Sequence, residues 1–261
     1  MCIRDSYLFA RASLHPIGAG AALIALAVMI HGLLGVFGPR ATAGTLDAHT
    51  YIPANAPALV PTVRAEQSRL WADHPAPYML AGLIEQESCI SLTHSRCWSP
   101  TSRLKTPREE GAGLGQITRA WRPDGSLRFD AIADQRARHP ELAALSWANV
   151  YQRPDLQIRT IVLMSRDLGG QALRVAATPI DALAMADAGY NGGWGGVQSD
   201  RRACQIKTGC NPGTWFAHVE RTCSKSRVPI YGSRSACDIN REHVTNVVRV
   251  RSVKYAPFWG V

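Results

Sequence analysis

An acidic residue on the apolar face of a helix is the strongest candidate for chemistry in this chain. A helix is predicted over residues 75–87, where apolar side chains recur at helical spacing after a proline. At about 100° per residue, Glu87 falls on the same stripe as Leu80 and Ile84. Glu85 points away from that stripe. Burial would raise the pKa of the Glu87 carboxyl, so that it holds a proton near neutrality as a general acid must. The alternative is a helix-end glutamate that a backbone or arginine partner satisfies at the margin of the core.

A glycine-rich turn follows at 111–116, with the sequence Gly-Ala-Gly-Leu-Gly-Gln. Its glycines remove side-chain bulk, so a polysaccharide could lie against the main chain. A phosphate-binding loop is the competing interpretation. It is not favoured, because no strand is predicted before the turn and no Lys-Ser or Lys-Thr pair follows Gly115.

A second glycine-bearing segment, at 188–193, reads Ala-Gly-Tyr-Asn-Gly-Gly. It ends a predicted helix that begins with Thr178 as its N-cap and Pro179 in its first turn. The hydroxyl of Tyr190 stands on a rigid ring and is able to reach a buried carboxyl. Taken alone, Tyr-Asn-Gly-Gly is typical of an ordinary helix end with a left-handed glycine.

In this order, the three segments resemble the lytic transglycosylases of the soluble-lytic-transglycosylase (SLT) type, which belong to the lysozyme-like superfamily. Members of that family carry a Glu-Ser pair, then a Gly-Leu-Met-Gln turn, then a Tyr-Asn-x-Gly segment. The corresponding segments here are Glu87-Ser88, the turn at 111–116 and the segment at 188–193. The similarity covers residues 75–193, about half of the chain.

The resemblance implies that Glu87 is the catalytic acid and base. It also implies that the serine hydrogen-bonds the sugar or the glutamate, and that the turn and its glutamine approach the sugar. The tyrosine would position the carboxyl group or the substrate, and the asparagine would brace the turn. These substrate-binding residues are Ser88, Gly113, Leu114, Gln116, Tyr190 and Asn191. Gly115 departs from the family pattern, because methionine usually stands there and forms an apolar wall. The loop over 89–110 is also somewhat longer than usual.

The activity implied is cleavage of the β-1,4 bond between N-acetylmuramic acid and N-acetylglucosamine in peptidoglycan, without a cofactor. Protonated Glu87 would donate to the glycosidic oxygen, and the substrate's acetamido group would stabilise the sugar cation. Glu87 would then deprotonate the C6 hydroxyl that closes a 1,6-anhydro ring. A hydrolytic, goose-type-like muramidase would instead need a second carboxylate, for which Glu109 and Glu110 are the nearest candidates in sequence. A third alternative is a lysozyme-like module that binds glycan without cutting it, in a secretion apparatus, a conjugation machine or a phage particle.

The N-terminal part predicts export. Residues 1–6, Met-Cys-Ile-Arg-Asp-Ser, resemble the translation of a transposase sequencing adapter and are expected not to belong to the protein. Residues 17–37 form an apolar run whose only ionisable residue is His31, long enough to span a membrane. The sequence Ala-Thr-Ala at 41–43 fits a signal-peptide cleavage pattern, so 7–43 is either an inner-membrane anchor or a cleaved signal peptide. The domain is expected in the periplasm or cell envelope.

Export implies an oxidising compartment, in which cysteines pair as disulfides. Without Cys2 six cysteines remain, and six allow many arrangements. Near-neighbour pairing is expected because each pair closes a short loop that contains glycine or serine: Cys89–Cys97, Cys204–Cys210 and Cys223–Cys237. A metal site is not expected, since the chain has no Cys-x-x-Cys pair and no histidine at regular ligand spacing.

The formal net charge is +9 and is spread along the chain, most densely at 201–202 and 249–254. This charge could serve contact with anionic cell-wall polymers or lipid headgroups, although scattered solvated charge is the simpler explanation. No nucleic-acid motif is present. The expected partners are therefore peptidoglycan glycan strands, and the membrane if the anchor is retained.

The expected fold class is mainly α: a disulfide-bearing, lysozyme-like (transglycosylase) domain preceded by an N-terminal hydrophobic helix. A linker rich in proline, alanine and threonine is expected over 44–61, and the catalytic domain, with a cysteine-rich C-terminal part, over 62–261. Helices are predicted over 62–73, 75–87, 129–139, 140–147, 155–177 with an interruption at 169–170, 178–193 and 240–255. A polar loop is predicted over 88–110, the segment 194–238 is expected to be loop-rich, and no β-hairpin is expected.

Overall fold

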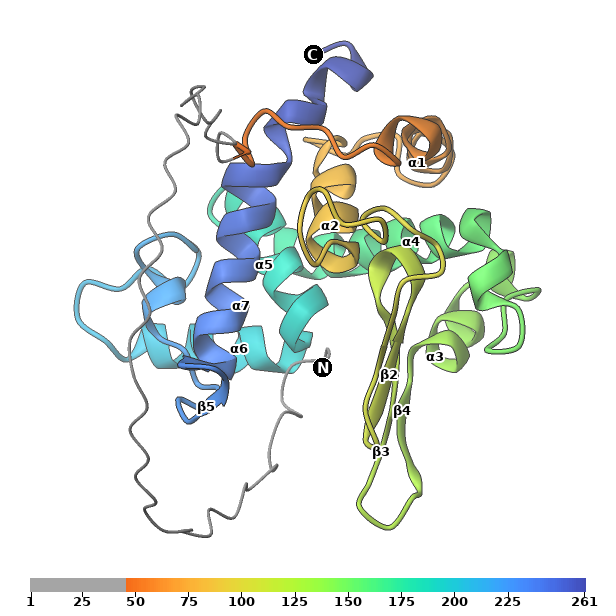
Figure 1. The fold of residues 1–261 in the computed structure, drawn as a ribbon. Coiled ribbons are helices and arrows are strands. Elements are labelled where there is room, and N and C mark those ends of the chain that lie inside the picture. Colours follow the sequence, from red (N-terminus) through yellow and green to blue (C-terminus); the bar gives the residue numbers. More distant parts are fainter. Residues whose placement is uncertain (1–45) are drawn as a thin grey trace, which may run out of the picture. The chain divides into compact units, whose positions relative to one another are not determined.

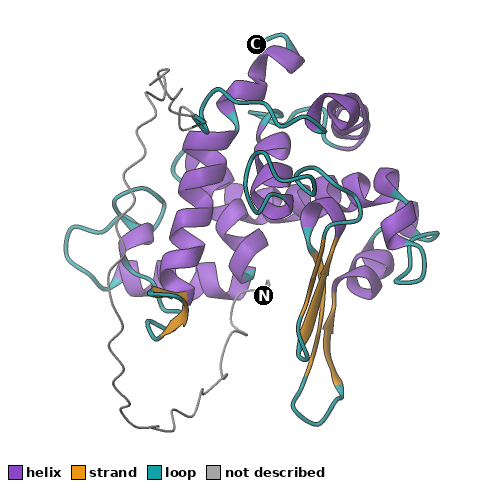
Figure 2. Cartoon of the chain, viewed as in Figure 1, coloured by secondary structure: helices purple, strands orange, loops and turns teal. Residues whose placement is uncertain are grey.

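The computed structural model describes residues 46–261, whose fold is drawn in Figures 1 and 2. The expectations for residues 1–6 and 7–43, including the apolar run at 17–37, lie outside these residues. Within 46–261, no helix combines the length and the apolar composition needed to cross a membrane.

Helices make up most of the described chain, which confirms the mainly α class. The α-helices are α1 (Ala56–Leu70), α2 (Met79–Ser88), α3 (Ala131–Arg138), α4 (Pro154–Leu173), α5 (Pro179–Gly192), α6 (Trp194–Gln205) and α7 (Ala236–Thr245). Short 3-10 turns are η1 (Gly113–Gly115), η2 (Pro140–Leu142), η3 (Val150–Gln152) and η4 (Val219–Arg221). After α7 the chain continues as a π-helix, η5 (Asn246–Arg251), and a 3-10 helix, η6 (Val253–Trp259).

The helices α4 and α5 lie at the centre of the main hydrophobic core. They pack along each other, and α4 also contacts α1 while α5 contacts α6 and α7 (Figure 1). Ile161 and Met185 are fully buried in this core. The predicted N-cap of α5 is confirmed, because the Thr178 hydroxyl accepts a hydrogen bond of 3.2 Å from the amide of Asp181.

The helix α4 runs through 169–170 without the expected interruption. A glycine inside a helix costs about 1 kcal/mol relative to alanine. Burial of the apolar face of α4, with Leu163 and Ala172 fully buried, outweighs that cost. Helix propensity alone therefore predicted the wrong outcome here.

A four-stranded antiparallel sheet, which the sequence did not lead us to expect, stands beside the helices (Figures 1 and 2). Its strands, in spatial order, are β1 (Arg103–Lys105), β2 (Glu109–Ala112), β3 (Ile117–Trp121) and β4 (Leu127–Asp130). It adjoins a second cluster of buried apolar residues that includes Ile117, Ile132 and Leu156. The predictions of a polar loop over 88–110 and of no hairpin are wrong. The strands are too short to show an apolar alternation, and ion pairs add to the backbone hydrogen bonds between them.

Those cross-strand ion pairs centre on Glu110, which lies opposite Arg119 in the β2–β3 register. The Glu110 carboxylate is 2.7 Å from Arg103 on β1 and 2.7 Å from Arg119 on β3. It also accepts a hydrogen bond of 3.0 Å from the hydroxyl of Tyr151. Burial alone would raise the pKa of Glu110, but the hydrogen bonds from Arg119 and Tyr151 outweigh this and lower it.

Two expected boundaries are corrected by the helices. Helix α1 begins at Ala56, with Pro57 in its first turn, so residues 56–61 of the expected linker are helical. Proline is tolerated there because the first amides of a helix lack intrahelical partners. Helix α6 occupies part of 194–238, which was expected to be loop-rich, and a small two-stranded ribbon of β5 (Pro229–Tyr231) and β6 (Arg234–Ser235) precedes α7.

All three predicted disulfides are present. They join Cys89 to Cys97, Cys204 to Cys210, and Cys223 to Cys237. The near-neighbour pairing was predictable because short separations keep paired cysteines close in nearly any fold. The first bridge begins directly after α2 and closes the loop over 89–97, which directly precedes Trp98, a fully buried residue.

Glu85 is fully buried, contrary to the prediction that it faces away from the core. Its carboxylate accepts hydrogen bonds from Lys254 Nζ at 2.8 Å and from the Tyr255 hydroxyl at 2.5 Å, and Arg251 lies 3.3 Å away. These partners belong to η5 and η6, which pack against α2. The angular position of Glu85 on the helix was right. A second layer of chain covers that face, and a single-helix pattern cannot reveal such a layer.

Replacing Glu85 with glutamine should lower the free energy of unfolding by about 3–5 kcal/mol, because it breaks a buried ion pair. The Lys254 side chain is only 2% exposed, so its charge would lose its partner without gaining water. Urea unfolding with the disulfides intact measures the change. Glu141→Gln, at an exposed position, is the matched control and should change stability by less than about 0.5 kcal/mol. An equal, small effect for both variants would show that the Glu85 ion pair does not stabilise the fold.

Candidate active site

Glu87 is held by a buried histidine that the sequence analysis did not identify. Its Oε1 lies 2.9 Å from Nε2 of His243 on α7. Nδ1 of the same ring lies 2.9 Å from Oδ2 of Asp187 on α5. We call Glu87, His243 and Asp187 the carboxylate–histidine triad. The Glu87 side chain is only 9% exposed, which agrees with the expected burial. The expected surroundings were apolar, whereas the polar imidazole ring of His243 borders the carboxyl group.

His243 carries a positive charge at neutral pH. Burial alone would lower its pKa, but the carboxylates of Asp187 and Glu87 outweigh burial and raise the pKa to about 10. Both ring nitrogens of the charged imidazole donate hydrogen bonds. Oε1 of Glu87 therefore accepts from Nε2–H, while Oε2 accepts no hydrogen bond from residues 46–261.

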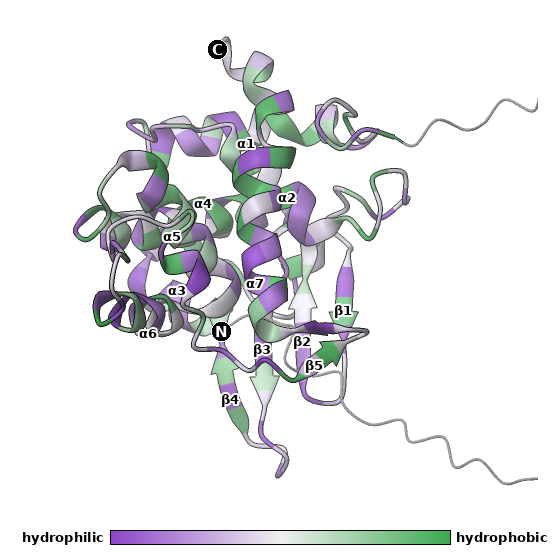
Figure 3. Ribbon diagram, turned by 90° about the vertical axis from the view of Figure 1, so that its left-hand side faces the viewer, coloured by the Kyte–Doolittle hydropathy of each residue, from purple (hydrophilic) through white to green (hydrophobic). Residues whose placement is uncertain are grey.

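The triad depends on the packing of α7 against α5. Figure 3 shows that α7 carries both hydrophilic and apolar residues along its length. One turn before His243, Asn240 donates hydrogen bonds of 3.0 Å to the carbonyl of Ala188 and to Oδ1 of Asn191. Asn191 was expected to brace the glycine turn. In the structure it joins α5 to α7 and so supports the position of His243.

Glu87 opens onto a cavity of about 170 Å³ beside the end of α2, the first disulfide loop, β1 and the glycine turn. Its lining residues are Gln86, Glu87, Ser88, Cys89, Ile90, Arg96, Ser102, Arg103, Leu104 and Gln116. We call it the Glu87 cavity. Among these described residues, Glu87 provides the only carboxyl group. Arg96 and Arg103 give the lining cationic groups.

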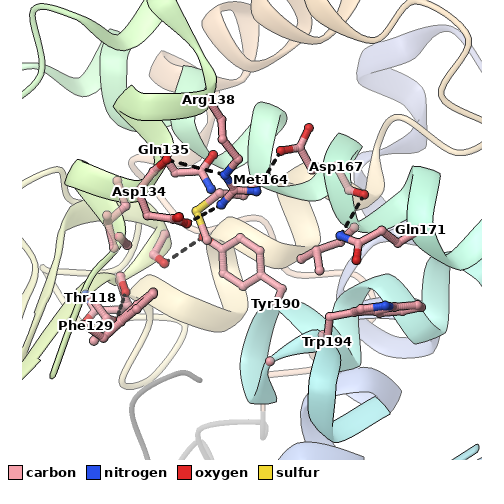
Figure 4. A pocket seen from close by; sticks show the side chains of 17 residues that line it. Thr118, Phe129, Asp134, Gln135, Arg138, Met164, Asp167, Gln171, Tyr190 and Trp194 are labelled. Atoms are coloured by element: carbon pink, nitrogen blue, oxygen red, sulfur yellow. Dashed lines mark hydrogen bonds and ion pairs between the residues drawn. The ribbon is translucent and has the colours of Figure 1, made fainter. Parts of the chain in front are cut away.

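A second cavity, of about 220 Å³, lies between β3, β4, α3, α4 and α5, and Figure 4 shows the side chains around it. We call it the α3–α4 cavity. Gln116 lines both cavities, and Tyr190 and Trp194 line the second. The two cavities therefore adjoin at Gln116, the residue that ends the glycine turn.

The glycine turn is held from within the fold by Gln157, another residue that the sequence analysis missed. Gln157 is fully buried at the start of α4. Its Oε1 accepts a hydrogen bond of 2.9 Å from the amide of Leu114, and its Nε2 donates to the carbonyl of Pro100 at 2.9 Å. Gly113 adopts a φ of 69°, and an added Cβ would lie 2.1 Å from Gln157 Oε1. Only glycine fits at this position.

Tyr190 holds the other side of the turn, because its hydroxyl donates a hydrogen bond of 2.9 Å to the carbonyl of Gly115. A Cβ on Gly115 would lie 2.5 Å from Cγ1 of Ile161 and 2.6 Å from the Tyr190 hydroxyl. The methionine that the family usually carries therefore has no room here. The departure from the family pattern has a packing cause in this fold.

Some of the remaining predicted site residues line a cavity, and the others line neither cavity. Gln116 lines both cavities, and Ser88 lines the Glu87 cavity. Ser88 is nevertheless only 2% exposed. Its hydroxyl donates a hydrogen bond of 2.7 Å to the carbonyl of Ile84 and accepts one of 3.0 Å from the amide of Trp98. Gly113, Leu114 and Asn191 line neither cavity.

No family model matches the chain, and no curated protein matches it. The resemblance to lytic transglycosylases thus rests on three ordered segments. Glu87 and Ser88 share one cavity with Gln116, whereas Tyr190 lines the neighbouring cavity and does not line that of Glu87. Within residues 46–261 no group of three or more histidine, cysteine, aspartate or glutamate side chains is arranged to hold a metal ion.

Replacing His243 with glutamine should destabilise the protein in a pH-dependent way. A pKa raised from 6.5 to about 10 contributes stability that is fully present below pH 6.5 and is lost as the pH rises through 10. The variant should therefore be less stable than wild type by about 3–5 kcal/mol near pH 6, and the gap should narrow towards pH 10. Urea unfolding at several pH values measures it, with His49→Gln at an exposed position as control. A gap that stays constant over this range would show that His243 is uncharged in the fold.

Replacing Gly115 with alanine should cost about 1–3 kcal/mol, since the added methyl group overpacks against Ile161 and Tyr190. The effect should be less than additive with Tyr190→Phe, which removes the hydroxyl that the methyl group meets. Thermal and urea unfolding of the single and double variants measure the coupling. Gly195→Ala on α6 is the matched control, because nothing lies within 4 Å of the added Cβ. A loss no larger than that of Gly195→Ala would contradict the tight fit of the turn.

Proposed function

We propose that this protein is a peptidoglycan lytic transglycosylase, which cleaves the β-1,4 bond between N-acetylmuramic acid and N-acetylglucosamine. The observation that carries the proposal is the single carboxyl of the Glu87 cavity, backed by a charged histidine. Glu87, Gln116 and Tyr190 come from the three segments whose order resembles the family. In this fold they border two neighbouring cavities.

One carboxyl is sufficient for the reaction. Protonated Glu87 gives its proton to the glycosidic oxygen as the bond from C1 to that oxygen breaks, and the acetamido oxygen of the muramic acid residue bonds to C1. The Glu87 carboxylate then takes the proton of the C6 hydroxyl, and O6 displaces the acetamido oxygen to close the 1,6-anhydro ring. The proton returns to Glu87, and water is not consumed.

His243 acts in this scheme as a positioning residue. Its Nε2–H bonds Oε1 of Glu87 at 2.9 Å, which fixes the carboxyl group and leaves Oε2 for proton transfer. When Glu87 has lost its proton, the new negative charge lies next to the imidazolium. Preorganised charge of this kind stabilises an ionic intermediate without reorganisation during the reaction.

A hydrolytic muramidase would need a second carboxylate to activate water. The two candidates, Glu109 and Glu110, lie on β2, and neither lines the Glu87 cavity. Glu110 is bound by two arginines and a tyrosine, so its oxygens are already engaged. These contacts favour the transglycosylase over the hydrolase.

The proposed place of action is the periplasm or cell envelope, where peptidoglycan strands would be the partner. Three disulfides within residues 46–261 support an oxidising compartment. Glycan binding without cleavage, in a secretion, conjugation or phage assembly, would use the same cavity but would not need an ionisable group at position 87.

Incubation of purified sacculi with the protein should release muropeptides that end in 1,6-anhydromuramic acid, identified by mass spectrometry. Glu87→Gln should lower the initial rate by a factor of about 10²–10⁴, as expected for the loss of a general acid and base. Glu141→Gln is the matched control and should retain the wild-type rate. Reducing ends in the products would favour the muramidase. Binding of sacculi without any release of muropeptides would favour the non-catalytic module.

A further inference from the structure

The α3–α4 cavity is acidic, although the chain as a whole is strongly basic. Its ionised lining residues are Asp134, Arg138 and Asp167, which give a formal charge of −1. Arg138 pairs with Oδ2 of both aspartates, and His139 also contacts Oδ2 of Asp167, at 2.9 Å. Oδ1 of either aspartate accepts no hydrogen bond from the part of the chain that the structure describes. Two carboxylate oxygens are therefore left to accept donors from a ligand.

A buried amide provides an independent indication of a ligand. Gln135 lines the same cavity and is only 3% exposed (Figure 4). Its Oε1 is buried and accepts no hydrogen bond from any residue in 46–261. An acceptor left unsatisfied in the interior costs free energy, and a hydrogen-bond donor on a bound molecule would remove that cost.

The apolar part of the lining suits an aliphatic chain in the ligand. Met164 and Leu168 on α4, Ile117 on β3 and Phe129 on β4 are among the apolar residues of the wall, and the Trp194 ring also lines it. A ligand that suits this cavity carries several N–H donors and a positive charge at the end of a short aliphatic chain. A primary ammonium group on such a chain meets these requirements, because it has three donors and no acceptor.

We infer that the α3–α4 cavity binds the ammonium-bearing side chain of a diamino acid in the peptide stem of peptidoglycan. This inference rests on the proposed function, since it places the stem of the same substrate one residue, Gln116, away from the Glu87 cavity. Lysine and diaminopimelic acid share the aliphatic ammonium group, and they differ in the extra carboxylate that diaminopimelic acid carries beside it.

Isothermal titration of the full chain with soluble stem peptides tests the inference without requiring turnover. The probes are the tripeptides Ala–γGlu–Lys and Ala–γGlu–diaminopimelic acid, each compared with the same peptide acetylated on its side-chain amine. Acetylation removes the charge, and binding should weaken by about tenfold or more. The parent peptide that binds more tightly identifies the stem type. Equal binding of the free and acetylated forms, or no binding of either, would overturn the inference.

The variant Gln135→Leu tests whether the α3–α4 cavity itself binds the peptide. The variant should bind the free-amine peptide about tenfold more weakly than wild type, while its melting temperature is unchanged or higher because an unsatisfied buried amide is removed. Gln152→Leu makes the same substitution at an exposed position on η3 and should leave peptide binding as in wild type. Weaker binding together with a lowered melting temperature would indicate a structural role for Gln135 and would overturn its assignment as a ligand acceptor.

A rate comparison separates the failure of this inference from the failure of the proposed function. Wild type should cleave stem-bearing strands faster than strands from which an amidase has removed the peptides, and Gln135→Leu should reduce that ratio. Cleavage of both substrates at an equal rate by wild type would overturn the inference alone. Peptide binding without cleavage of either substrate would overturn the proposed function and leave the cavity assignment standing.

Discussion

A charged histidine between two carboxylates is the interaction on which the site depends. His243 links Glu87 at the end of α2 to Asp187 within α5, with 2.9 Å between partners on each side. Ions removed from water lose hydration energy, which only close and well-directed partners restore. The packing of α5 against α7, with Asn240 joining the two helices, keeps these partners in place. The same contact therefore maintains the fold and holds the carboxyl group that is proposed to react.

Local patterns in the sequence identified what lies within one helix, one turn or one short loop. They found Glu87 on the α2 stripe, the N-cap at Thr178 and the disulfide partners, since neighbours along the chain determine each of these. They did not find His243, because the contact joins positions 156 residues apart and no spacing rule relates them. Glu85 was misplaced for a related reason. Its surroundings are set by η5 and η6, which lie far along the chain.

The short sheet was missed for a different physical reason. Its strands carry charged residues where an apolar alternation would identify a strand, and Glu110 joins three of the elements through Arg103, Arg119 and Tyr151. The glycine turn between β2 and β3 was recognised, but its role changed. Gln157 and Tyr190 bond its main chain from two helices, so most of its residues maintain the shape of the turn, and Gln116 is the residue of the turn that lines both cavities.

The long separation between Glu87 and His243 has a consequence for biosynthesis. During translation α2 emerges well before α7, so a nascent chain holds the glutamate without its imidazole. Contacts between distant positions form late, after the intervening loop has been closed at an entropic cost. An incomplete polypeptide therefore lacks the assembled centre, which arises only once nearly the entire domain has been made.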